Sequence, residues 1–187
     1  MSVSEARERL LDAAVEQAMN GGITDLSLRE LAAAIGTSHR MLIYHFGSRE
    51  GLLVAVARKV EDAQRAIVAS WSATMDARLA WQHFSDPKLW PQERLFFEMY
   101  AHALLGRPGT EGFAEAVVEP WIAMLADRMA GSGLSQAEAR AHARLAVAVT
   151  RGLLLDLLGS GDSAGVTDAF DCYLALTEHY FDEHRAR

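Results

Sequence analysis

The fold is decided by residues 27–53, SLRELAAAIGTSHRMLIYHFGSREGLL, which contain two short helical patterns joined by a tight turn. Ser27 and Glu30 have the capping-box spacing that starts a helix, and apolar residues with helical spacing follow them. Gly36 ends this helix after about two turns. Serine is a common N-terminal cap of a helix, so Ser38 is expected to start a second helix. The stretch therefore predicts two short helices around a glycine-containing turn.

The two predicted helices, 28–35 and 39–45, form a helix-turn-helix pattern. In such a motif the first helix supports the second, which lies in the major groove of DNA. Arg40 lies in the first turn of the second helix, and an arginine there can bind guanine through two hydrogen bonds. Two short helices around a glycine also occur in α-proteins that bind no DNA, so the pattern alone leaves the function open.

The composition is that of a soluble globular protein. The chain has 187 residues, of which 50% are apolar and 23% charged, so it can bury a substantial core. Its single cysteine, Cys172, excludes an internal disulfide and a zinc site with several cysteines. Because we find no apolar run of roughly 18 residues and no signal peptide, we expect a cytoplasmic protein with no membrane partner.

The net charge of −7 is unevenly distributed along the chain. Residues 1–60 carry seven basic and seven acidic side chains, whereas residues 61–187 carry eleven basic and eighteen acidic ones. A neutral N-terminal part followed by an acidic body is compatible with a small DNA-contacting module.

The remainder of the chain is also predicted to be helical, because no segment alternates apolar and polar residues with the period of a strand. We therefore predict an all-α protein, with further helices at 4–20, 48–75, 77–85, 88–105, 111–130, 135–158 and 164–184. Pro91 is expected in the first turn of its helix. Pro120 falls inside a helical pattern and is expected to kink or split that helix.

Residues 10–53 resemble the N-terminal domain of TetR-type transcriptional repressors. The shared pattern comprises Ala13-Ala14, Gly22, Ser27, Leu31-Ala32, Gly36-Thr37-Ser38, Ile43 to Phe46, and Arg49-Glu50-Gly51-Leu52-Leu53. The resemblance implies a three-helix DNA-binding domain at 1–50, with its helix-turn-helix at about 27–46. It also implies a helical ligand-binding and dimerisation domain at 51–187, where the chain matches the family only in architecture.

The resemblance also implies roles for single residues of the N-terminal domain. Arg49 stands where the family has a phosphate-binding lysine, and Arg29 stands where a base or phosphate contact is often made. Ile43 replaces the family's usual phosphate-bonding tyrosine, and Tyr44 can supply that hydroxyl one position later. The candidate DNA-contacting residues are Arg29, Thr37, Ser38, His39, Arg40, Met41, Ile43, Tyr44, His45 and Arg49.

The middle of the chain is rich in large apolar residues. The helix predicted at 88–105 is apolar on more than one side, which is typical of a buried helix that can line a cavity. The resemblance implies a pocket for a small, largely apolar inducer; the alternative is a tightly packed aromatic core. The candidate ligand-binding residues are Trp71, Trp81, Phe96, Met99, Tyr100, His102 and Trp121.

The last two predicted helices, 135–158 and 164–184, have more apolar side chains than their packing against each other would cover. The excess favours a two-fold interface between copies, and the resemblance likewise implies a homodimer. Ordinary packing within one chain is the alternative. The candidate interface residues are Leu145, Val149, Gly152, Leu153, Tyr173, Leu176 and Tyr180.

Together these features predict a transcriptional regulator, a repressor that a ligand releases from a palindromic double-stranded operator. Two rival classes are a protein-binding helical scaffold and a small helical enzyme. The enzyme is disfavoured because we find no nucleophile paired with a base, no glycine-rich phosphate loop and no HExxH motif. We therefore expect no cofactor. The acidic end, with Glu178-His179 and Asp182-Glu183-His184, has residue types that can bind a metal, but we expect a solvated surface there and no metal site.

Overall fold

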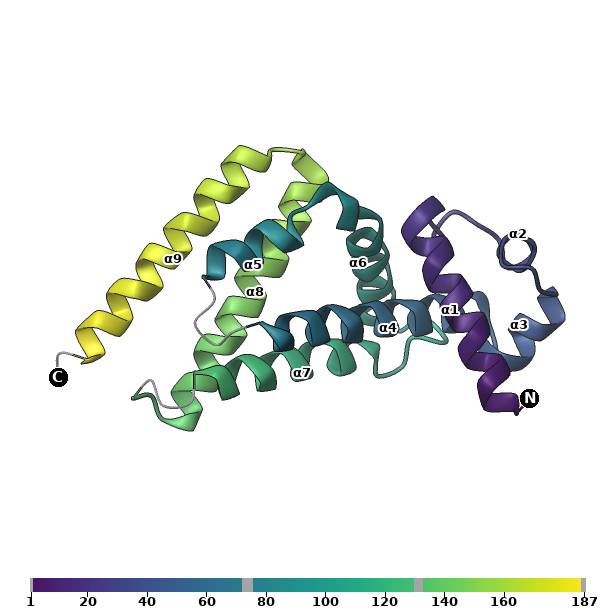
Figure 1. Ribbon diagram of the computed structural model, residues 1–187, viewed down its shortest axis with the longest axis horizontal. Coiled ribbons are helices and arrows are strands. Elements are labelled where there is room, and N and C mark those ends of the chain that lie inside the picture. Colours follow the sequence, from purple (N-terminus) through teal and green to yellow (C-terminus); the bar gives the residue numbers. More distant parts are fainter. Residues whose placement is uncertain (1, 72–75, 130–132, 186–187) are drawn as a thin grey trace. The chain divides into compact units, whose positions relative to one another are not determined.

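The computed structural model of the chain describes residues 2–71, 76–129 and 133–185 (Figure 1). This part is helical and contains no strand, so the all-α prediction is confirmed. Its elements are α1 (Val3–Gly21), α2 (Leu28–Ala34), α3 (His39–Phe46), α4 (Arg49–Ser70), α5 (Ala77–Phe84), the 3-10 helix η1 (Pro87–Leu89), α6 (Trp90–Leu104), α7 (Phe113–Arg128), α8 (Gln136–Ser160) and α9 (Ser163–Arg185).

These helices form two compact units. The first unit comprises Met1–Ala66 and Lys88–Val117, and the second comprises Ile67–Pro87 and Val118–Arg187. The first part of α4 thus belongs to the same unit as α1, α2 and α3. The functional boundary expected at residue 50 remains a prediction.

Serine side chains cap several helices, among them α2, whose start at Ser27 the sequence predicts. Ser2, Ser27 and Ser135 each form a complete capping box with the glutamate three residues later. Ser48 accepts a hydrogen bond from the backbone N–H of Gly51 at 2.9 Å, which fixes the start of α4. These interactions are local, so the starts of the helices can be read from short stretches of sequence.

Of the two outcomes expected at Pro120, a kink or a split, the split is wrong, because α7 continues through this residue. A proline inside a helix removes one backbone hydrogen bond. Val117, Trp121 and Ile122, which surround it along the helix, are all buried. Burial of these side chains favours the helical path strongly enough to outweigh the missing hydrogen bond.

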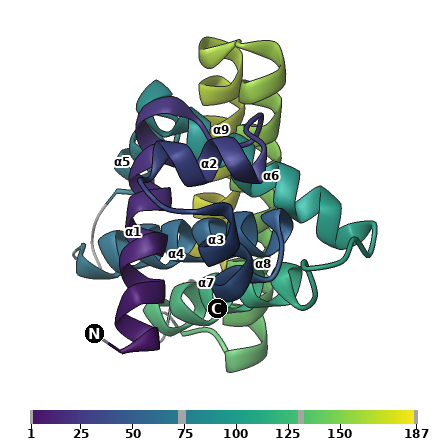
Figure 2. The same ribbon diagram turned by 90° about the vertical axis from the view of Figure 1, so that its right-hand side faces the viewer.

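The core of the first unit is formed by aliphatic side chains. Leu31 of α2, Leu42 of α3 and Leu52 of α4 are completely buried, and α2 packs on α3. Helix α1 packs against α6 and is further attached to α4, because Lys59 pairs with Glu8 and with Asp12, the latter at 2.6 Å. These two carboxylates raise the pKa of Lys59. Helices α1, α2 and α3 face the viewer in Figure 2.

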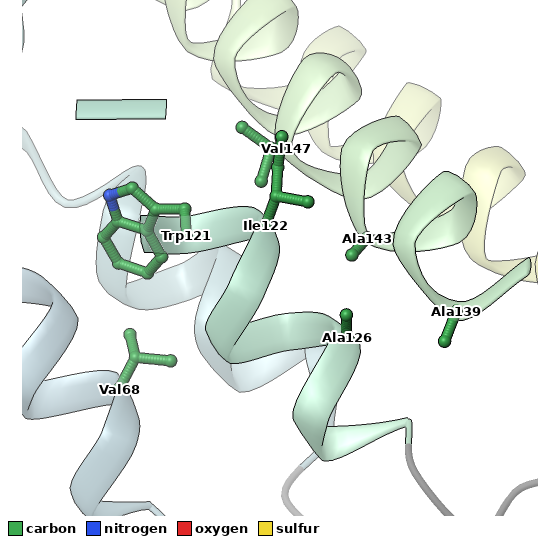
Figure 3. Packing of buried hydrophobic residues seen from close by; sticks show 7 residues of the cluster. All are labelled: Val68, Trp121, Ile122, Ala126, Ala139, Ala143 and Val147. Atoms are coloured by element: carbon green, nitrogen blue, oxygen red, sulfur yellow. The ribbon is translucent and has the colours of Figure 1, made fainter. Parts of the chain in front are cut away.

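The second unit has its own core where α4, α7 and α8 meet (Figure 3). The buried cluster consists of Val68, Trp121, Ile122, Ala126, Ala139, Ala143 and Val147. Arg128 of α7 donates to the backbone carbonyls of Val68 and Trp71, at 2.5 and 3.0 Å, and so satisfies the C-terminal end of α4.

Helices α8 and α9 form an antiparallel hairpin in the second unit (Figure 1). Helix α5 packs on α9, where the Trp81 indole stacks on Phe170 with ring centroids 4.9 Å apart. The indole N–H donates to the hydroxyl of Thr167 at 3.1 Å, so this buried polar group is satisfied. In the part of the chain that is described, no helix has both the length and the hydropathy needed to cross a membrane.

Candidate nucleic-acid interface

The helix-turn-helix begins at a complete capping box. The Ser27 N–H donates to the Glu30 carboxylate at 2.8 Å, and the Glu30 N–H donates to the Ser27 hydroxyl oxygen at 3.3 Å. The hydrogen bonds from Ser27 stabilise the ionised carboxylate and thereby lower the pKa of Glu30. The start of α2 is thus defined by two reciprocal contacts.

The turn between α2 and α3 depends on Gly36, whose φ of +68° lies in the left-handed region that favours glycine. The turn is closed by the N–H of Thr37, which donates to the Ala32 carbonyl at 2.8 Å. Ser38 then caps α3, since its hydroxyl oxygen accepts from the Met41 N–H at 3.2 Å. This geometry confirms the two short helices and the turn that the sequence predicts.

Helix α3 is held by contacts at its C-terminal end and along one face. Leu42 is completely buried on the side where α3 packs on α2. At the C-terminal end, Arg7 of α1 donates to the His45 carbonyl at 3.4 Å, and its guanidinium lies 5.0 Å from the centre of the Phe46 ring. A Cβ atom at Gly51 would lie only 2.2 Å from the Phe46 carbonyl oxygen, so this close approach of α4 to α3 requires glycine.

The opposite face of α3 is open to solvent. His39 and Arg40 are exposed, and Tyr44 is 66% exposed although it is aromatic. Met41 and Ile43 also belong to this exposed face, whereas His45 is half-buried. A short helix with a cationic, aromatic and hydroxyl-bearing outer face has the chemistry that base edges and phosphates require.

The other candidate residues of the N-terminal domain lie outside α3. Arg29 is exposed on α2, and Thr37 and Ser38 form the turn before α3. Arg49, at the start of α4, instead faces the loop before α2. Its Nε donates to the Leu26 carbonyl at 2.8 Å, and its second terminal nitrogen donates to the Thr24 carbonyl.

Comparison with known proteins agrees with this geometry. Residues 10–56 match the family described as "Bacterial regulatory proteins, tetR family". A transcriptional regulatory protein of Mycobacterium tuberculosis named RaaS, described as HTH-type, is 32% identical over 100 residues, which are 51% of this chain and 40% of RaaS. The N-terminal segment of the chain is therefore similar to the TetR family, and the match to RaaS covers less than half of that protein.

Solved structures extend the similarity to the whole fold. The multidrug binding protein EbrR in complex with ethidium is 26% identical, with a TM-score of 0.66 over 90% of this chain and 97% of EbrR. A TetR-family regulator from Streptomyces coelicolor has a TM-score of 0.69 over 100% of this chain and 87% of its own, at 16% identity, which shows the fold alone. The family is described as one of regulatory proteins, and this likeness supports the prediction that the chain is not an enzyme.

The ligand-binding candidates are divided between the two units. Phe96 and Met99 are buried on α6 of the first unit, together with the half-buried Tyr100 and His102. The three candidate tryptophans, Trp71, Trp81 and Trp121, belong to the second unit. Trp121 meets Phe84 edge-to-face at 5.8 Å, and Trp71 meets His83 at 5.3 Å.

Sequence reasoning did not find a pocket of about 250 Å³ at the end of α6 and the start of α7. None of the residues predicted to bind a ligand lines it; its lining is Ala103, Gly106, Arg107, Thr110, Glu111, Gly112, Phe113, Ala114 and Glu115. The glycines and proline of residues 106–109 indicated a break between helices, but such a break does not show that the backbone will leave a hollow.

The candidate interface residues are exposed to different extents. Leu145, Gly152 and Leu176 are exposed on α8 and α9. The half-buried candidates are Val149, Leu153, Tyr173 and Tyr180, and burial raises the pKa of the Tyr173 hydroxyl. Among the residues that the structure describes, no three His, Cys, Asp or Glu side chains gather to hold a metal ion. The metal candidate His184 lies outside the residues whose side chains are described.

The capping box gives a test of the start of α2. Because the folded state lowers the pKa of Glu30, the stability that this group contributes is present above its unfolded pKa and is lost as the pH falls through its folded pKa. Ser27→Ala removes the larger of the interactions that lower it, so we expect the pKa of Glu30 to rise toward its ordinary value in an NMR titration of the side chain.

Ser38→Ala is the matched control, because Ser38 caps α3 without a glutamate partner. This variant should cost about 1 kcal/mol of stability and leave the pKa of Glu30 in place. An unchanged Glu30 titration in Ser27→Ala would contradict the assigned capping box.

Proposed function

We propose that this chain is a transcriptional repressor that binds a double-stranded operator as a homodimer and is released by a small, largely apolar ligand. One observation carries the DNA-binding part: α3 buries Leu42, exposes Arg40 and Tyr44 on the opposite face, and exposes His39 in its first turn, inside a segment that matches the TetR family. If these polar side chains were buried, they could not contact DNA. Their exposure on one helix suits insertion of that helix into the major groove.

The residues of this face suggest distinct contacts. Arg40 is suited to bind guanine O6 and N7 with two hydrogen bonds, and Tyr44 is suited to donate to a phosphate. Met41 and Ile43 are apolar and exposed, so they can contact thymine methyl groups. The further proposed contacts to bases or phosphates come from Arg29, Thr37, Ser38, His39 and His45.

The homodimer is supported by two exposed stripes on the α8–α9 hairpin. On α8 the exposed residues recur at alternating spacings of four and three, and they are Ala141, Leu145, Ala148, Gly152, Leu155 and Gly159. The same spacing on α9 exposes Gly165, Ala169, Cys172 and Leu176. These small and apolar residues allow two hairpins to approach closely, which suits a two-fold four-helix bundle.

The exposed fractions of the large residues in these stripes support an interface. Leu145 is 47% exposed, Leu155 is 55% exposed and Leu176 is 72% exposed. A second copy would cover this apolar surface. Two copies would also present two α3 helices, and these would read successive major grooves if they lie about 34–36 Å apart.

A ligand is supported by the likeness to EbrR, whose structures contain proflavin, ethidium and imidazole. This chain has buried aromatic and sulfur-containing side chains on α6, and its residues 61–187 carry an excess of acidic groups. A ligand that binds preferentially to the DNA-free arrangement weakens DNA binding, and DNA weakens ligand binding by the same factor.

Selection of random duplexes on the purified protein tests the DNA-binding proposal. We expect a palindromic sequence whose half-sites lie about one helical turn apart. Arg40→Ala should lose about 1–3 kcal/mol of operator affinity and relax the preference at one position of each half-site. Arg94→Ala, which removes an exposed arginine from α6, is the control and should retain the preference. Recovery of no preferred duplex would refute the proposal.

Sedimentation tests the dimer. In Leu176→Glu a carboxylate replaces an apolar residue in the proposed interface, so burial of the charge should raise the dissociation constant of the dimer by about 100-fold or more. Leu79→Glu is the control, since Leu79 is 52% exposed on α5, outside the two stripes. The proposed interface is wrong if the Leu176→Glu variant dimerises as tightly as the wild-type chain.

Calorimetry with proflavin and ethidium tests the ligand-binding proposal. Binding is measured without DNA, because flat aromatic dyes also bind duplexes. We expect saturable binding that Tyr100→Ala weakens by about tenfold, as expected for the loss of one buried aromatic contact. Tyr44→Ala, in the DNA-reading face, should bind the dyes normally. Equal dye affinity in both variants and the wild-type chain would argue against a site beside α6.

A further inference from the structure

The first residue of α4, Arg49, uses its guanidinium inside the protein. Its Nε donates to the Leu26 carbonyl at 2.8 Å, and one terminal nitrogen donates to the Thr24 carbonyl. The other terminal nitrogen lies 3.7 Å from the carboxylate of Glu50. The side chain is only 24% exposed. Most of the hydrogen-bonding capacity of this arginine is therefore directed at groups of its own chain.

The two carbonyl acceptors lie in the loop just before α2. Leu26 immediately precedes Ser27, which caps α2, and Arg49 follows the Gly47-Ser48 break that ends α3. A single guanidinium thus joins the entrance of the helix-turn-helix to its exit, although the two lie 23 residues apart in sequence. The entrance loop is itself anchored, because the Leu26 N–H donates to the carbonyl of the buried Ile23 at 3.3 Å.

Only an arginine has the geometry for this connection. Its planar group presents parallel N–H donors, which here meet two carbonyl oxygens two residues apart. A lysine at this position would keep the charge but offers one compact ammonium on a flexible stem, so it cannot reproduce both contacts with the same rigidity. This chemistry distinguishes a connecting role from simple attraction of a phosphate.

We propose that Arg49 is a positioning residue, which holds the two ends of the helix-turn-helix together and so sets the orientation of α3, rather than a ligand of the DNA phosphates. The proposal rests on the proposed DNA-binding function. It replaces the phosphate contact that the position of Arg49 implies by resemblance. In the protein without DNA, the contacts of Arg49 also hold the loop at residues 23–27 in place.

The test compares Arg49→Lys and Arg49→Ala with the wild-type chain, using the selected operator over a range of salt concentrations. A positioning role predicts that both variants lose about tenfold or more in affinity, because each breaks the paired contact to the backbone. The slope of log affinity against log salt should remain that of the wild-type chain, since no phosphate contact is lost.

A direct phosphate contact gives the opposite pattern. Arg49→Lys would then retain both affinity and slope, and Arg49→Ala would lower the magnitude of the slope by about 0.9. That result would overturn the proposal. The failure of lysine to rescue the function is thus the outcome that separates an orienting arginine from a charge on the surface.

Hydrogen exchange in the absence of DNA provides an independent readout. Arg49→Lys should increase amide exchange in residues 23–27, whereas the control Arg40→Ala should leave that loop unchanged. Unchanged loop exchange in Arg49→Lys would overturn the positioning role. If the wild-type chain selects no duplex, the DNA-binding proposal fails, and the exchange result still decides whether Arg49 orders the loop.

Discussion

Burial of one side of α3 is the constraint on which the helix-turn-helix depends. Leu42 is completely removed from solvent on the side where α3 packs on α2, and this fixes the rotation of the helix about its own axis. A helix turns by about 100° per residue, so a shift of a single position would bury Met41 or Ile43 instead and turn Arg40 and Tyr44 away from the outer face. The exposure of the outer face of α3 is therefore a direct consequence of how the core is packed.

The sequence predicted well those features that depend on near neighbours. The capping residues Ser27, Ser38 and Ser48 interact with groups three residues away, so the starts of three helices could be located from short patterns. Pro120 shows the limit of such patterns. Its local preference opposes a continuous helix, and the burial of Val117 and Ile122, which decides the outcome, depends on segments distant in sequence.

The direction of long side chains could not be predicted in the same way. The positions of Arg7 and Arg49 in the sequence suggest surface cations, yet both donate to backbone carbonyls that lie 38 and 23 residues away, respectively. The aromatic residues of the body present the same difficulty, since Trp81 finds its stacking partner Phe170 on the last helix. Which apolar residues pack and which line a hollow depends on the meeting of distant helices.

The exposure of the outer face of α3 has an evolutionary consequence. Tyr44 is 66% exposed and Arg40 is also exposed, so replacing either of them removes little packing. Substitutions at such surface positions usually change the free energy of unfolding by only a few tenths of a kcal/mol. Gly51, by contrast, is confined by the nearby Phe46 carbonyl. Under the proposed function, duplicated copies of such a gene can therefore diverge in the DNA they recognise while their folded scaffold stays the same.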